Sequence, residues 1–323
     1  MHAAFITRWS SALRRATARG RASALRRATA LLAAVAVAGC AGSTSGPAAG
    51  GGRIRIVAAE NFWGSIAAQL AGAKGSAQSI IVNPAQDPHS YEPTAQDART
   101  LAGAQLVIVN GVGYDPWAPR LLAANPVPGR TVLTVGDLFG LKEGDNPHRW
   151  YDPQEVQAVA NAIAASLEKL DAKDAAYFRS RRAAFETQGL ASYHALIAQI
   201  RARYAGVPVG ASESIFAMQA PALGLDLITP PSFMKAISEG TEVTPQDTAT
   251  AERQLTSHQL KVWVYNSQNV TPEIQRLTAL AHRQHIPVAT VTETLSPVTD
   301  DFEQWQVAQL QGIEAALQAA TRR

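Results

Sequence analysis

Two histidines of this chain occupy matching turns framed by proline. His89 lies in Asp87–Pro93, which reads D-P-H-S-Y-E-P, and His148 lies in Asn146–Pro153, which reads N-P-H-R-W-Y-D-P. Proline fixes its own φ and disfavours helix at the residue before it, so each imidazole is expected on a stiff turn. A single loop histidine is usually solvated or packed, but two histidines in matching turns indicate a common function. The commonest such function is binding a metal ion.

The residues around each histidine predict a connection that ends in a helix. Residues 79–82 favour a strand leading to His89, and Thr94 with Asp97 three residues later has the pattern of a helix N-terminus. After the second histidine, Asp152-Pro153-Gln154-Glu155 predicts another capped helix start. Strand-to-helix connections are where α/β proteins bind ligands.

The hydrophobic pattern predicts an α/β fold with two β/α lobes, each a mainly parallel sheet flanked by helices. Strands and helices alternate in an N-terminal lobe (53–171) and again in a C-terminal lobe (206–323). Within the second lobe we expect a helix from about residue 216 to 223, a strand at 225–228, a proline-rich loop to Thr244 and a last helix at about 301–320. Residues 172–205 contain few helix breakers and predict a long bridging helix, in one or two pieces, with Gly189 as its weak point.

The charge of the chain is unevenly distributed. The 323 residues carry a formal net charge of +3, but seven arginines precede residue 40 and no acidic residue does. Without those seven, 22 basic residues face 26 acidic ones, so the rest of the chain is mildly acidic. A basic footprint for nucleic acid is therefore missing, and we expect no nucleic-acid partner.

The first 52 residues have the pattern of an export and anchoring segment. An arginine-rich stretch is followed by the apolar run 28–38, which is shorter than the ~20 residues that span a bilayer. Val37-Ala38-Gly39-Cys40 resembles a bacterial lipobox, in which the cysteine is lipidated. We therefore expect a lipoprotein signal peptide at 1–39, and a lipidated Cys40 with a flexible linker at 40–52. Cys40 is the only cysteine, which excludes an internal disulfide and a thiolate metal cluster.

The two histidine motifs, Asp87–Thr94 and Asn146–Pro153, resemble the signature loops of cluster A-I substrate-binding proteins. These are zinc- and manganese-binding lipoproteins that serve ABC importers. Asn146 replaces the aspartate usual in the second motif. The resemblance extends from about residue 53 to the end of the chain and implies four metal ligands, two from each lobe.

Carried over residue by residue, the resemblance implies His89 and His148 as the first two ligands. Glu213, in S-E-S-I-F, fits the third position, and Glu293, in V-T-E-T-L, fits the fourth, where the family usually has aspartate. Glu242 and Asp300 are alternatives for the fourth ligand. As an alternative to ligation, Glu213 and Glu293 would be helix-start carboxylates that interact with the helix dipole.

Two neutral imidazoles and two carboxylates carry a charge of −2, which one divalent cation cancels. The oxygen content shifts preference toward Mn²⁺ or Fe²⁺, although the general affinity order favours Zn²⁺ over Mn²⁺. The resemblance implies a monomeric, non-enzymatic protein on the outer face of the cytoplasmic membrane that delivers Zn²⁺ or Mn²⁺, with Fe²⁺ as a further candidate, to an ABC transporter permease. The alternatives are a surface adhesin or structural lipoprotein with an incidental metal, and an exported metallohydrolase. The chain has no H-E-x-x-H motif, which disfavours the hydrolase.

Overall fold

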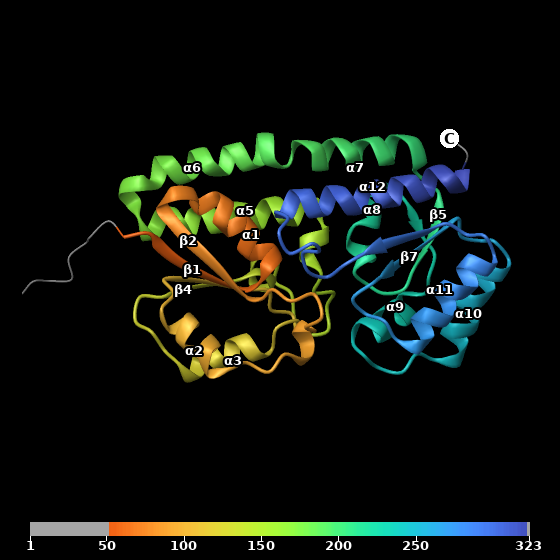
Figure 1. Ribbon diagram of the computed structural model, residues 1–323, viewed down its shortest axis with the longest axis horizontal. Helices are drawn as coiled ribbons and strands as arrows, with labels where there is room; N and C mark the ends of the chain where they lie inside the picture. Colours follow the sequence, from red (N-terminus) through yellow and green to blue (C-terminus); the bar gives the residue numbers. More distant parts are fainter. Residues whose placement is uncertain (1–51, 322–323) are drawn as a thin grey trace, which may run out of the picture. The chain divides into compact units, whose positions relative to one another are not determined.

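The computed structural model describes residues 52–321 (Figure 1). The expected signal peptide, Cys40 and nearly all of the linker lie outside the described residues. No helix in the described part of the chain is both long and apolar enough to cross a membrane.

The first lobe is a four-stranded parallel sheet with strand order β2-β1-β3-β4. Its strands are β1 (Ile54–Glu60), β2 (Gly75–Ile81), β3 (Leu106–Val109) and β4 (Thr131–Thr134). Its helices are α1 (Asn61–Ala71), α2 (Ala95–Ala102), α3 (Trp117–Ala124), the short α4 (Val135–Leu138) and α5 (Pro153–Leu170). Strand β2 begins four residues earlier than expected, because Gly75 and Ser76, residues of low β-propensity, pair with Ile54 and Arg55.

Burial on both faces of this sheet explains its sequence pattern. Alternate residues of β1 point to opposite sides, so Ile56 packs in the core that contains α1 and α5, whereas Val57 packs against α2 and α3. Every residue of β3 is buried for the same reason. The sheet is thus held between two layers of helices. The connections to the two histidines leave its carboxyl edge.

The second lobe repeats the arrangement, with a parallel sheet of strand order β6-β5-β7-β8. Its strands are β5 (Pro208–Ala211), β6 (Asp226–Leu227), β7 (Val262–Asn266) and β8 (Val288–Val291). Its helices are α8 (Ala220–Leu223), α9 (Pro231–Ser238), α10 (Pro245–Thr256), α11 (Pro272–Arg283) and α12 (Phe302–Thr321).

Two local predictions in the second lobe are wrong. The segment expected as a loop up to Thr244 contains helix α9, because Pro231 occupies a first-turn position where proline favours a helix, and Phe233, Met234 and Ile237 form its buried face. The helix expected at 216–223 is instead the 3₁₀ turn Phe216–Met218 followed by the single-turn α8, which ends at Gly224 in a left-handed conformation.

The bridge between the lobes consists of two helices. A 3₁₀ turn (Ala172–Asp174) leads into α6 (Ala175–Ala184), a π-helical turn spans Phe185–Gly189, and α7 (Ala191–Tyr204) follows (Figure 1). Helix α6 packs on α1 and α5 of the first lobe, whereas α7 packs on α8 and α12 of the second.

Helix α12 provides a second connection between the lobes. The Ser65 hydroxyl accepts a hydrogen bond from the Phe302 amide at 2.9 Å, and Gln69 Nε2 donates to Glu303 at 2.8 Å. Both partners on the first-lobe side belong to α1. The lobes are thus joined by helices at two places.

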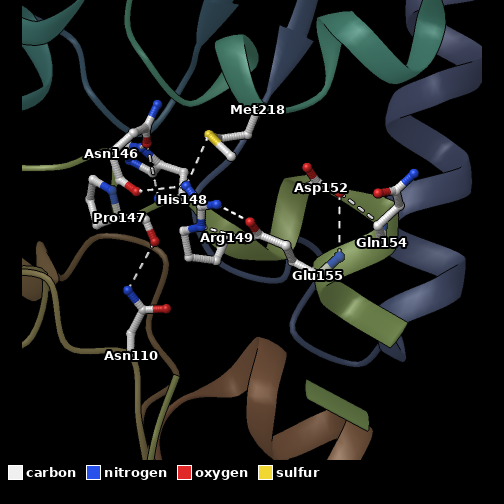
Figure 2. A network of polar contacts seen from close by, with 9 residues as sticks. All are labelled: Asn110, Asn146, Pro147, His148, Arg149, Asp152, Gln154, Glu155 and Met218. Carbon is white, nitrogen blue, oxygen red and sulfur yellow. Dashed lines mark hydrogen bonds and ion pairs between the residues drawn. The ribbon is translucent and has the colours of Figure 1, made fainter. Parts of the chain in front are cut away.

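The cap of α5 gives a stability prediction. The Asp152 carboxylate accepts hydrogen bonds from the amides of Gln154 and Glu155 at 2.8 and 3.3 Å (Figure 2). We expect Asp152→Ala to lower the free energy of unfolding by about 1 kcal/mol, because two N–H groups lose their acceptor. Gln154→Ala, which keeps those amides capped, should change it by less than about 0.5 kcal/mol. Urea unfolding followed by circular dichroism measures both, and equal effects of the two substitutions would contradict the capping argument.

Candidate metal centre

The first histidine is presented by a short 3₁₀ turn, Pro88–Ser90, in the connection after β2. The Asp87 carboxylate caps this turn by accepting from the His89 amide at 2.9 Å and from the Ser90 hydroxyl at 2.9 Å. His89 Nδ1 lies 3.3 Å from the carbonyl oxygen of Gly113. A carbonyl only accepts, so Nδ1 is the donor, and in the neutral form of the ring that coordinates a metal Nε2 is the free acceptor.

The second histidine is also oriented by a hydrogen bond at Nδ1, here to a side chain. His148 Nδ1 lies 2.8 Å from Asn146 Oδ1, and Asn146 Nδ2 donates to the Ser214 carbonyl at 2.7 Å. The Ser214 contact fixes which atom of the Asn146 amide is oxygen, so Nδ1 of His148 must be the donor and Nε2 is again bare.

The loop that carries His148 is fixed from several sides (Figure 2). Asn110, which follows β3, donates to the Pro147 carbonyl at 2.9 Å and accepts from Trp63 at 3.0 Å. On the other side, Arg149 forms an ion pair with Glu155 of α5 and contacts the sulfur of Met218 in the second lobe at 3.5 Å. Such support gives the imidazole one orientation.

The two bare nitrogens lie together. Nε2 of His89 and Nε2 of His148 are buried and have no hydrogen-bond partner. Ligand atoms of His89, His148 and Glu293 all lie within 4.8 Å of one another. Buried acceptors without a donor are costly, and a cation would satisfy both nitrogens at once while also binding the Glu293 carboxylate.

Glu293 comes from the second lobe, two residues after β8. Its two carboxylate oxygens accept from Asn266 Nδ2 at 2.8 Å and from the Tyr114 hydroxyl, in the first lobe, at 3.0 Å. Its backbone is also fixed, since its amide donates to Gln268 Oε1 at 2.9 Å. The side chain is therefore directed toward the histidines, and no α-helix begins at this position.

Glu213 lies beside this group but does not belong to it. It follows β5 by two residues, is 1% exposed, and accepts hydrogen bonds from Asn266 and, at 2.7 Å, from Asn269. Among the described residues, the ligand group includes neither Glu213 nor the two alternatives considered for the fourth position, Glu242 and Asp300. Glu242 is exposed, which further disfavours it.

Burial governs the ionisation of the centre. Desolvation is the main cause that lowers the pKa of His148 well below its usual value, and the nearby His89 adds to it, which favours the neutral, coordinating form of this imidazole. Burial, and then the neighbouring Glu293 carboxylate, raise the pKa of Glu213. Burial also raises the pKa of Glu293. Two carboxylates in one dry pocket repel each other, and a divalent cation removes that cost.

Two cavities reach the centre from different sides. One, of about 450 Å³, is lined by His89, Asn146 and residues of α9 including Met234. The other, of about 470 Å³, is lined by His89, Asn269 and Glu293. His89 thus borders both cavities, and Glu293 borders the second.

A family model described as zinc-uptake complex component A, periplasmic, matches residues 56–316. The chain belongs to this family. Members are substrate-binding components of metal uptake, which is the class implied by the two histidine motifs.

Curated relatives of the family include manganese lipoproteins. The chain is 30% identical over 141 residues to the manganese-binding lipoprotein MntA of Halalkalibacterium halodurans, an alignment covering 43% of this chain and 47% of the relative. It is 27% identical over 146 residues to the manganese ABC transporter substrate-binding lipoprotein PsaA of Streptococcus pneumoniae, covering 41% and 47%. The chain therefore spans about half the length of the curated relatives it matches.

Solved structures show the same fold. A Cd-bound periplasmic metal binding protein from Candidatus Liberibacter asiaticus superposes with a TM-score of 0.68 at 18% identity, covering 82% of this chain and all of that one. The substrate-binding protein FpvC of Pseudomonas aeruginosa in complex with Mn²⁺ gives a TM-score of 0.66 at 21% identity, covering 83% and 99%. The predicted architecture of two parallel-sheet lobes is confirmed.

Sequence reasoning missed the polar residues that orient the predicted ligands. Tyr114 and Asn110 follow β3, and Asn266 is the last residue of β7 with Gln268 and Asn269 just beyond it. Their shared signal is a polar side chain directly after a buried strand, because the carboxyl ends of parallel strands meet at one edge of the sheet.

The hydrogen bond between His148 Nδ1 and Asn146 Oδ1 can be tested by substitution. We expect Asn146→Ala to weaken metal binding about 10- to 100-fold, because His148 loses the acceptor that orients its ring. Asn146→Asp restores an acceptor, although it loses the donor to Ser214, and should retain more affinity than the alanine variant. Competition with a metal-binding dye measures each dissociation constant. Parent-like affinity in Asn146→Ala would show that the ring needs no such partner.

Proposed function

We propose that this protein is an extracytoplasmic solute-binding protein that captures one divalent transition metal, Zn²⁺ or Mn²⁺, and delivers it to an ABC importer. The observation that carries the proposal is the pair of buried, unpartnered Nε2 atoms facing the Glu293 carboxylate. The ligands are His89, His148, Glu293 and Glu213, with Glu213 as the fourth. Fe²⁺ matches the same nitrogen and oxygen donors.

Membership of this family supports a proposal for the partner and the location. Metal held between the lobes is handed to a membrane permease, and the protein acts as a binding protein without catalysis. A monomer suffices, because one chain supplies all four donors. We propose that lipid at Cys40 anchors the protein to the outer face of the cytoplasmic membrane, with the segment up to residue 52 as a flexible tether.

The first test concerns His89, which belongs to the ligand group. Protein from residue 41 onward is stripped of metal, offered equimolar Mn²⁺, Fe²⁺ and Zn²⁺, and analysed by elemental mass spectrometry. We expect one equivalent of metal in the parent and none retained by His89→Ala, because the variant loses a donor that no other described side chain replaces.

His194→Ala serves as the matched control, since His194 lies in α7 away from the ligand group. It should bind metal as the parent does. Intact binding in His89→Ala would overturn the proposal, and so would a parent that retains no metal.

The donor set gives a prediction on selectivity. Glu213→His replaces an oxygen by a nitrogen and leaves a three-nitrogen, one-oxygen site, which favours Zn²⁺ over the harder Mn²⁺. In the same competition we expect the ratio of bound Zn²⁺ to Mn²⁺ to rise about tenfold or more. An unchanged ratio would show that Glu213 does not touch the ion.

A further inference from the structure

Both oxygens of the Glu213 carboxylate are occupied by side-chain amides. Oε1 accepts from Asn266 Nδ2, and Oε2 accepts from Asn269 Nδ2 at 2.7 Å. Asn266 is the last residue of β7, and Asn269 lies in the connection that follows it. Glu213 is 1% exposed. Hydrogen bonds to a buried carboxylate are among the strong ones, so this pair keeps the side chain in one place.

Asn266 lies between the two acidic side chains. The same Nδ2 that donates to Glu213 also donates to Glu293 Oε1 at 2.8 Å. Glu293 belongs to the group of ligand atoms within 4.8 Å of one another, whereas Glu213 does not. One amide thus bonds to an acidic side chain inside the ligand group and to one outside it.

We propose that Asn266 and Asn269 hold Glu213 in reserve, and that Glu213 becomes the fourth ligand only by exchanging these amides for the metal. This inference rests on the proposed function, because it requires that a metal binds at His89, His148 and Glu293. The ion is caught first by those three residues. Glu213 then moves toward it and completes the coordination sphere.

The arrangement lowers net affinity, since part of the energy of the fourth metal bond is spent on breaking two buried hydrogen bonds. Such a reduction suits a carrier, which must release its ion. The opposite role is the common one for residues around a metal ligand: they pre-orient the ligand, and removing them weakens binding 10- to 100-fold. The two roles therefore predict opposite signs for the same substitution.

Asn269 is the residue to vary, because Asn266 also contacts Glu293 and Asn269 does not. Beyond Glu213, the Asn269 amide reaches only the Ile237 carbonyl, at 3.3 Å, among the contacts described. We expect Asn269→Ala to tighten Zn²⁺ and Co²⁺ binding about tenfold, measured by competition with a chelating dye. Asn269→Ser, which is also too short to reach Glu213 as an amide does, should tighten binding in the same direction.

A double-mutant cycle shows whether the effect passes through Glu213. In the Glu213→Gln background, Asn269→Ala should change the dissociation constant less than twofold, because the charged ligand it releases is gone. The visible spectrum of bound Co²⁺ should be the same in parent and Asn269→Ala, and different in Glu213→Gln. Ser267→Ala, in the same connection, is the matched control and should behave as the parent does.

The outcomes distinguish the reserve role of Glu213 from the proposed function of the protein. Weaker binding in Asn269→Ala, or an equal effect with and without the Glu213 carboxylate, would overturn the reserve role. In that case metal binding by the parent and its loss in His89→Ala would still support the proposed function. Binding that survives in His89→Ala would instead remove the basis of both.

Discussion

The orientation of two imidazoles by their Nδ1 atoms is the constraint on which the centre depends. The Gly113 carbonyl and the Asn146 amide oxygen can only accept, so each histidine donates from Nδ1, which leaves Nε2 to coordinate when the ring is neutral. The groups opposite them are carboxylates, which are also acceptors when ionised. The two Nε2 atoms, unlike the oxygens of Glu293, have no hydrogen-bond partner among the described residues. A small cation between them and Glu293 would give both nitrogens a partner.

The two sheets supply these groups from their carboxyl edges, and of the four residues only His148 and Glu293 follow strands in equivalent places of the strand order. Both have the same strand order, and in each the chain leaves the carboxyl edge into the centre: His89 after β2 and His148 after β4 in the first lobe, Glu213 after β5 and Glu293 after β8 in the second. Nitrogen donors therefore come from one lobe and oxygen donors from the other. An ion bound to both sets links the lobes, adding to the Tyr114–Glu293 and Asn146–Ser214 hydrogen bonds that cross between them.

The sequence was most informative where the chain signals its own local structure. The capping box of Thr94 and Asp97 and the Asp152 cap are present as predicted, because capping depends on residues only a few positions apart. The histidine turns were recognisable because proline restricts them locally. Helix α9 was missed because its signal, an apolar face of three residues in eight, only becomes visible once it packs against the second lobe. The amides of Asn266 and Asn269 were missed because their partner is Glu213, more than 50 residues away in the chain.

The connections between the lobes bear on how an ion leaves. Helices α6 and α7 each pack along one lobe, and α12 adds contacts from Phe302 and Glu303 to α1. Separating the lobes would break these contacts and the polar ones at the centre in a single step. If Glu213 is the fourth ligand, as proposed, moving its carboxylate breaks fewer contacts, because the amides of Asn266 and Asn269 can receive it as the metal bond breaks. The residue that completes the sphere would then also be the first to leave it, and release would begin with a side chain before any movement of a lobe.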